Sequence, residues 1–211
     1  MRRIQRVLLI SLMMVFVATG ANAVTVFTAN LTTSQEPSPP FVTPTTTTGA
    51  ARLTPFGTAT FVLNDLQTAL TFTATIFNID VTGTQTADIN DNLLNAHIHA
   101  GNTATPTFPV VWGFFGAPQN DVNPNDRVVT PFASGVGGTF SGKWDAPEGN
   151  NTTLAAQLAN ILAGGSYINF HTVQNPGGEI RGQILPAPEP SAAILTGVGM
   201  LLMGYVFRRR R

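Results

Sequence analysis

The amino-acid sequence predicts a mainly β protein: an antiparallel β-sandwich or barrel with one short α-helix at about residues 151–163. Many short segments alternate apolar and polar residues, and clusters of Gly, Pro, Asn and Asp separate them. Only one stretch has the apolar spacing of an amphipathic helix. Apolar segments at both ends predict an N-terminal signal helix and a C-terminal hydrophobic helix outside this domain.

The clearest predicted strand is LTFTATIF at residues 70–77. Strict alternation with threonine is typical of a strand that buries one face. The residues expected to be buried are Leu70, Phe72, Ala74 and Ile76. Similar patterns predict strands at 24–30, 57–63, 96–100, 110–115, 139–144, 167–172 and 179–185. Residues 34–48, rich in Pro and Thr, are expected to form a loop.

The predicted helix lies in NNTTLAAQLANILAGG. Its apolar stripe, at helical spacing, consists of Leu154, Leu158, Ile161 and Leu162. Asn151 is expected to cap its first turn, and Gly164 and Gly165 to allow the left-handed turn at its end. A helix this short is marginal in isolation, so we expect it to dock on the sheet. Asn-Pro-Gly-Gly at 175–178 predicts a tight turn between the last two strands.

The N-terminal segment 1–23 has the layout of a secretory signal peptide. Three arginines precede an apolar stretch at 7–18, which is too short to span a membrane. Ala21-Asn22-Ala23 is a small-residue cleavage site, so we expect signal peptidase to cut after Ala23. The mature domain is then predicted at residues 24–186.

The C-terminal segment 187–211 resembles a PEP-CTERM sorting signal. Pro188, Glu189 and Pro190 precede an apolar stretch at 191–207, and four arginines follow directly. Arginines resist transfer across the membrane, so the preceding domain is expected outside the cytoplasm. The resemblance implies transient anchoring of the C-terminal helix in the inner membrane. It further implies cleavage by an exosortase and release or attachment at the cell surface. A permanent tail anchor is the alternative.

Charge and cysteine content exclude several functions. Residues 24–187 contain four basic and ten acidic side chains, a formal charge of −6. An acidic surface argues against a nucleic-acid partner, because such binding requires cations at the phosphates. The chain has no cysteine, which excludes thiol redox chemistry and Cys-ligated metals. It also has no nucleophile elbow, paired-carboxylate signature or phosphate-binding glycine loop.

The three histidines of the chain, His97, His99 and His171, are the candidate metal ligands. On a strand, residues i and i+2 share a face, so His97 and His99 point the same way. His171 shares a face with Tyr167 and Asn169 on a later strand. If the two strands meet, three imidazoles converge on a site that suits zinc or copper. Ordinary hydrogen-bonded histidines on the polar face of a sheet are the alternative.

Two further polar groups have structural interpretations. Glu179 and Arg181 share a strand face, which predicts an ion pair that supports the hairpin; alternatively, Glu179 orients an imidazole. The stretch DVNPNDR at 121–127 begins like a calcium loop. However, Asp126 and Phe132 occupy the positions that require Gly and Glu, so we interpret it as a polar turn.

Two segments, AHIHAG at 96–101 and YINFHTVQNPGGEIRGQIL at 167–185, resemble the CHRD (chordin-type) domain. The resemblance implies a β-rich extracellular domain and no known reaction. A weaker likeness to copper–zinc superoxide dismutases comes from the histidine arrangement. We therefore expect a non-enzymatic domain, displayed or released at the cell surface, that binds extracellular matrix or polysaccharide. The alternative is a metal-binding domain that uses the three histidines.

Overall fold

The computed structural model describes residues 24–39, 41–101 and 107–187. The predicted signal peptide with its cleavage site at Ala23, and the sorting motif Pro188-Glu189-Pro190 with the apolar segment that follows it, lie outside these residues. Among the described residues, no helix has the length and apolar character needed to cross a membrane.

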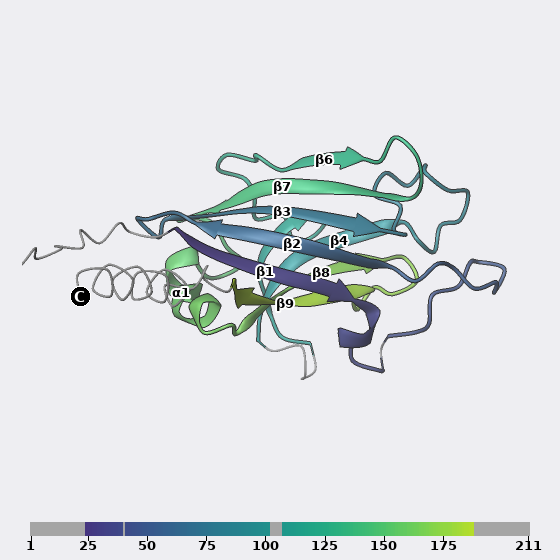
Figure 1. Ribbon diagram of the computed structural model, residues 1–211, viewed down its shortest axis with the longest axis horizontal. Helices are drawn as coiled ribbons and strands as arrows, with labels where there is room; N and C mark the ends of the chain where they lie inside the picture. The colour runs from purple at the N-terminus through teal and green to yellow at the C-terminus, as the bar shows by residue number, and fades with distance from the viewer. Residues whose placement is uncertain (1–23, 40, 102–106, 188–211) are drawn as a thin grey trace, which may run out of the picture.

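The domain is built on one antiparallel sheet of nine strands (Figure 1). Their order across the sheet is β5-β4-β8-β9-β1-β2-β3-β7-β6. The strands are β1 (Thr25–Thr32), β2 (Phe56–Leu63), β3 (Ala69–Phe77), β4 (Leu93–Ala100), β5 (Val110–Phe115), β6 (Val128–Pro131), β7 (Gly137–Asp145), β8 (Ser166–Thr172) and β9 (Ile180–Pro186). A short 3₁₀ turn, η1 (Thr33–Gln35), follows β1. The mainly β class is thus confirmed, and the sandwich or barrel takes the form of a single curled sheet.

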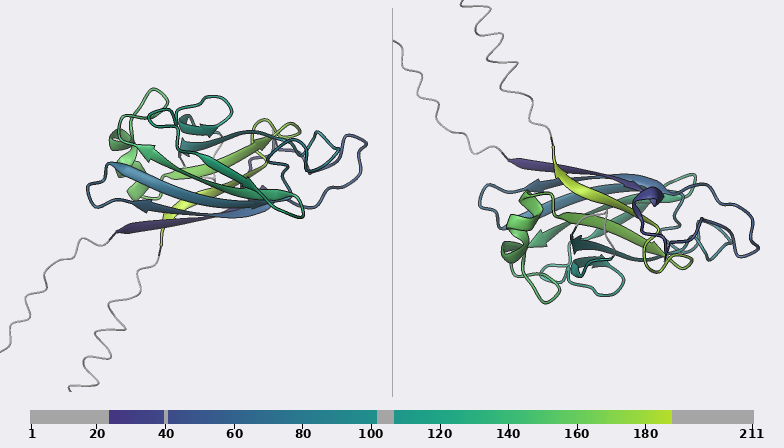
Figure 2. Two further views of the ribbon diagram at one scale, coloured as in Figure 1. Left: turned by 90° about the horizontal axis from the view of Figure 1, so that it is seen from above. Right: turned by 90° about the horizontal axis from the view of Figure 1, so that it is seen from below.

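The sheet curls so that its two halves pack against each other (Figure 2). Trp112 of β5 stacks on Trp144 of β7, with ring centroids 5.7 Å apart. Phe170 of β8 packs edge-on against Phe114 of β5 and Phe140 of β7. These side chains are fully buried, as are Leu70, Phe72, Ala74 and Ile76 of β3, which confirms the alternation expected there. Strands far apart in the sheet order therefore enclose one aromatic core.

The predicted helix is present as α1 (Leu154–Leu162), with two corrections. The N-cap is Thr153, whose side chain accepts a hydrogen bond from the Ala156 amide, and not Asn151. Asn151 has a φ of 54° and belongs to the preceding turn. Leu154 and Ile161 are buried and Leu158 packs on the core, but Leu162 is 39% exposed. Gly164, with a φ of 70°, makes the predicted left-handed turn.

All eight predicted strands are confirmed within a few residues at their ends. The β8–β9 hairpin is confirmed as well. Strand β6 was not predicted. It has only four residues, ends in Pro131 and lies at the sheet edge with mostly exposed side chains, so it has no alternating pattern. Proline is tolerated at this position because an edge strand leaves half of its amides unpaired.

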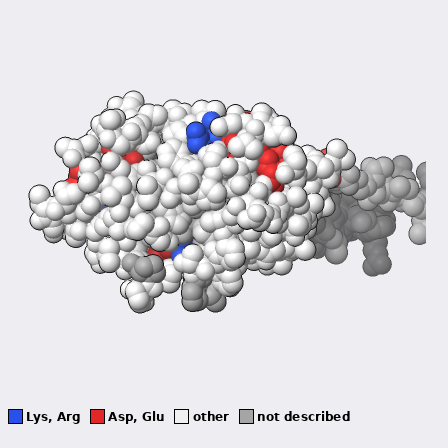
Figure 3. Space-filling model, turned by 180° about the vertical axis from the view of Figure 1, so that it is seen from behind, with Lys and Arg blue, Asp and Glu red and all other residues white. Residues whose placement is uncertain are grey.

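The outer face of the β4–β8–β9 region is polar and yet buried. His97 and His99 of β4, Tyr167 and Asn169 of β8, and Arg181 of β9 are each at most 4% exposed. Loops cover them: the segment after η1 reaches Arg181, and the turn before β9 reaches His171. The face of the molecule seen in Figure 3, opposite to the view of Figure 1, is mostly uncharged and has only small acidic and basic patches. The domain therefore has a second, polar interior outside its aromatic core.

Candidate metal centre

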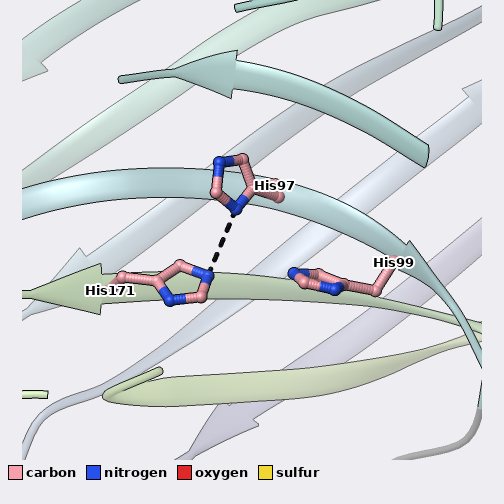
Figure 4. Close-up of side chains that lie close together, drawn as sticks. All are labelled: His97, His99 and His171. Carbon is pink, nitrogen blue, oxygen red and sulfur yellow. Dashed lines mark hydrogen bonds between the residues drawn. The ribbon is translucent and has the colours of Figure 1, made fainter. Parts of the chain in front are cut away.

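The paired strands β4 and β8 bring the three histidines together. In the register of this pair, His97 lies opposite Asn169 and His99 opposite Tyr167, and His171 lies two residues beyond Asn169 on the same face. One nitrogen of each ring lies within 4.8 Å of one nitrogen of the other two (Figure 4). The convergence expected if these strands met is therefore present in the structure.

Each imidazole uses its other nitrogen to bind a backbone carbonyl. Nε2 of His97 lies 2.9 Å from the Ala117 oxygen, and Nδ1 of His99 lies 2.7 Å from that of Phe108. Nδ1 of His171 lies 3.0 Å from the oxygen of Pro176. Because a carbonyl only accepts, each of these ring nitrogens must carry the proton. The remaining nitrogen of each neutral ring is then an unprotonated electron-pair donor.

The contact between His97 and His171 has the spacing of two metal ligands. Nδ1 of His97 and Nε2 of His171 are 3.3 Å apart, marked by the dashed line in Figure 4. Both neutral rings have already used their single proton on a carbonyl, so none is left for a bond between them. Zn–N bonds of about 2.0–2.1 Å at tetrahedral angles place two nitrogens about 3.3–3.4 Å apart. A cation between them would satisfy both lone pairs.

His99 completes the set but is not yet at the ligand spacing. Its Nε2 is buried and has no hydrogen-bond partner. The candidate ligand nitrogens lie within 4.8 Å of one another. A shift of the His99 ring by roughly 1.5 Å would reduce that separation to the nitrogen–nitrogen spacing of a tetrahedral site. The carbonyl partners of the three rings are what fix their tautomers, as is usual for metal-ligating histidines.

Burial keeps the three rings neutral. It is the main reason why the pKa of His99 is lowered to about 4 and that of His171 to about 3, and the neighbouring imidazoles contribute to both shifts. Burial also lowers the pKa of His97. Metal binding requires unprotonated nitrogens, so the site is ready for a cation at neutral pH without losing protons from these ring atoms.

A row of buried groups leads away from His99. Its ring stacks on Tyr167 with centroids 4.8 Å apart, and the guanidinium of Arg181 lies 4.6 Å from the Tyr167 centroid. Arg181 in turn binds the carboxylate of Glu36 through Nε and Nη2, at 2.8 and 2.6 Å. Desolvation raises the pKa of Glu36 to about 7, although Arg181 opposes this shift.

The predicted ion pair between Glu179 and Arg181 is therefore wrong. Glu179 pairs with Arg52 at 2.8 Å and also accepts a hydrogen bond from Asn175. It makes no bond to an imidazole among the described contacts; the second ring nitrogen of His171 binds the Pro176 carbonyl instead. The segment between β1 and β2 supplies Arg52 and Glu36, a long-range contact that strand periodicity cannot reveal. The 121–127 turn is held by Asp121, which accepts from the Asp126 and Arg127 amides.

Asn169 is the residue of this site whose importance the sequence did not show. Its side chain is fully buried beside the carboxylate of Glu36, whose pKa it helps to lower, although neither Oδ1 nor Nδ2 makes a hydrogen bond of normal geometry. The only available signal was its position between Tyr167 and His171 on one strand face. The sequence also indicated no role for Gly113. A Cβ at Gly113 would lie 1.9 Å from the Pro118 carbonyl oxygen, so glycine lets the loop that contains Ala117 approach His97.

Comparison with protein families matches residues 27–184 to the CHRD domain. The chain belongs to the CHRD family. This confirms the resemblance seen in AHIHAG and in the β8–β9 hairpin. Searches among curated proteins and among solved structures gave no match. All three histidines of this CHRD domain lie within the matched residues, so the candidate metal centre is part of the family domain itself.

Proposed function

We propose that this CHRD domain binds one Zn²⁺ or Cu²⁺ ion through His97, His99 and His171. The observation that carries the proposal is the convergence of three unprotonated nitrogens whose partner nitrogens are all held by carbonyls. Histidines that serve only to hydrogen-bond the core would not need their remaining, unprotonated nitrogens to converge on one point. Imidazole is a ligand that suits both zinc and copper, and a three-histidine set leaves a fourth position for another ligand.

The ion would serve first as a structural link. The ligands come from two neighbouring strands, and their carbonyl partners come from the segments around Phe108, Ala117 and Pro176. Binding would therefore order three covering loops together with the β4–β8 pair. A domain without disulfides gains stability from any ligand that binds only its folded state.

The test is the metal content of the purified full-length protein. We expect close to one Zn²⁺ or Cu²⁺ per chain after loading and removal of excess ion. His99→Phe and His171→Phe keep an aromatic ring in place but remove the ligand nitrogens, so both should lose most of the metal. Tyr167→Phe, which changes a ring stacked on His99 without removing a nitrogen, is the matched control. Equal metal content in wild type and both histidine variants would refute the proposal.

We propose further that the domain works outside the cytoplasm as a non-enzymatic module that contacts extracellular matrix or polysaccharide. The supports are the N-terminal segment ending at Ala23, the Pro188-Glu189-Pro190 motif with its arginine tail, and membership of a family whose domain is known in extracellular proteins. On this proposal, signal peptidase and an exosortase process the chain. Cell fractionation with antibodies to the domain tests this, and an uncut chain in the cytosol would refute it.

A further inference from the structure

A small cavity opens at the pole of the domain from which the β1–β2 connection projects (Figure 1). That connection, the β3–β4 connection and the turn before β7 form its walls. The Thr47 amide donates to Asp88 Oδ2 at 2.8 Å, and the Asn78 amide donates to the Val136 carbonyl at 2.9 Å, which holds these segments together. The cavity has a volume of about 220 Å³, below the roughly 300–1,000 Å³ of pockets for drug-sized ligands. We call it the pole pocket, and its lining includes Arg52, Leu53, Thr86, Asp88, Asp91 and Val136.

The pole pocket combines apolar surface with negative charge. Leu53, which is 76% exposed, and Val136 supply the apolar part, and Asp88 and Asp91 supply the carboxylates. Asp80 adds a third negative charge close enough to raise the pKa of Asp91. A ligand that matches this lining carries a positive charge on an apolar body.

Asp91 is the carboxylate of the pocket with unused acceptor capacity. It is only 6% exposed, and its two oxygens lie 3.0 and 3.2 Å from the Thr86 hydroxyl, their only donor among the described residues. That hydroxyl also lies 3.0 Å from the Asp88 carbonyl, and it has one proton for all three oxygens. A carboxylate accepts up to about four hydrogen bonds, so most of the capacity of Asp91 is free. Burial raises the pKa of Asp91, as expected for an anion without a directly bound cation.

The basic side chains of the described chain are engaged elsewhere. Arg52 lines the pocket, but its Nη2 binds Glu179 at 2.8 Å and Gln174 at 2.9 Å, and it makes no bond to either carboxylate of the pocket among the described contacts. Because Glu179 offsets the charge of Arg52, the aspartates leave the pocket negative. The remaining bases bind other groups: Lys143, Arg181 and Arg127.

The arrangement of the carboxylates favours an organic cation over a metal ion. A metal ion needs several ligand atoms around one point. Within the described residues, the three histidines are the group of metal-ligating side chains whose atoms converge in this way, and the aspartates of the pocket do not. An ammonium group needs only one carboxylate, since its three N–H donors can use the free positions of Asp91. Its alkyl chain can then lie along apolar surface, as lysine side chains do.

We infer that the pole pocket binds a primary ammonium group on a short alkyl chain, as in a lysine side chain or a free alkylamine. The ammonium donates hydrogen bonds to Asp91, Asp88 adds electrostatic attraction, and the alkyl chain packs against Leu53 and Val136. The site shares no residue with the histidine cluster, so it stands independently of the proposed metal centre.

Butylamine is the probe, and the readout is the set of backbone amide NMR signals of the purified full-length protein. Near pH 7 the amine is protonated, because the pKa of such a group is about 10.4. Wild type should show saturable shifts centred on residues 46–53 and 86–91. Butanol has nearly the same shape without the charge, so it should bind at least about tenfold more weakly. Equal affinity for amine and alcohol, or no saturable shift at the pocket, would overturn the inference.

Asp91→Asn removes the charge at nearly constant shape and leaves an oxygen that can still accept from Thr86. It should bind butylamine about tenfold more weakly than wild type. Asp65→Asn, in the exposed turn between β2 and β3, loses the same charge away from the pocket and should bind as wild type does. An Asp91→Asn protein with wild-type affinity would refute the inference. If this variant fails to fold, the comparison of amine with alcohol on wild type still decides.

A second ligand distinguishes the two sources of the ammonium group. The amide of Nα-acetyl-lysine carries the same ammonium on a chain attached to a peptide backbone. If it binds at least as tightly as butylamine and also depends on Asp91, the pocket accepts a lysine side chain of a partner protein. Weaker binding than butylamine, with the same dependence on Asp91, assigns the pocket to a free alkylamine. Binding of either ligand that ignores Asp91→Asn would contradict the site.

Discussion

Metal affinity should depend only weakly on pH between 7 and 5.5. A proton competes with the ion for each ligand nitrogen, so affinity falls as pH falls through the pKa of that imidazole in the folded protein. Three histidines with an ordinary pKa of about 6.5 would each lose about eightfold over this interval, or about 600-fold together. Burial lowers the pKa of His99 to about 4 and of His171 to about 3, so these two contribute almost nothing to the loss.

Burial also lowers the pKa of His97, so its share of the loss is at most the roughly eightfold of an ordinary histidine. We therefore expect the affinity to fall less than about tenfold. The assay is competition with a chromophoric chelator whose own proton competition is known, performed at pH 7.0, 6.2 and 5.5. A loss of several hundredfold would show that the three rings titrate normally and are not desolvated as the structure indicates.

Three further predictions concern stability, each measured by urea unfolding of the metal-free protein. Phe170→Ala, which empties a fully buried position between Phe114 and Phe140, should cost about 3–5 kcal/mol, whereas Leu66→Ala at an 81% exposed site should cost less than about 0.5 kcal/mol. Equal losses in the free energy of unfolding for the two substitutions would contradict the placement of Phe170 in the core. Gly178→Ala would put a Cβ 2.4 Å from Glu36 Oε1 and should destabilise more than Gly49→Ala, a site that also has a positive φ but has open space around it. The reverse order would be evidence against this packing. Asp80→Asn should cost about 1–3 kcal/mol near pH 7, because four backbone amides of the 82–86 loop donate to its carboxylate and lower its pKa although burial opposes this. The deficit should shrink as pH falls through the lowered pKa, where the wild-type carboxylate is protonated as well; a constant deficit would argue against the assignment.

The local part of this fold could be read from the sequence. Alternation found the buried face of β3, and the i, i+2 rule placed His97 and His99 on one face, because both depend only on neighbouring residues. The helix was found for the same reason, but its cap was not. Asn151 and Thr153 are both good caps, and only the left-handed φ of Asn151 decides between them.

What the sequence did not reveal depends on contacts between distant segments. Nothing in β9 indicates that Arg181 pairs with Glu36, about 145 residues earlier, instead of with Glu179. Strand periodicity also predicts one solvent-exposed face for β4 and β8, whereas loops bury that face and bring Glu36 to the side chain of Asn169. Such loops follow no repeat, so their positions become visible only in three dimensions.

The ends of the described chain are adjacent, and this affects how the molecule is held. The Ala187 amide donates to the Val26 carbonyl at 2.8 Å, so β1 and β9 enter and leave the sheet side by side. The connection from β1 to β2 projects from the opposite pole (Figure 1). Any attachment beyond residue 187 thus suspends the domain from a single point, with the loops of the far pole facing outward. Cleavage beyond residue 187 would release the domain without removing a strand from the sheet.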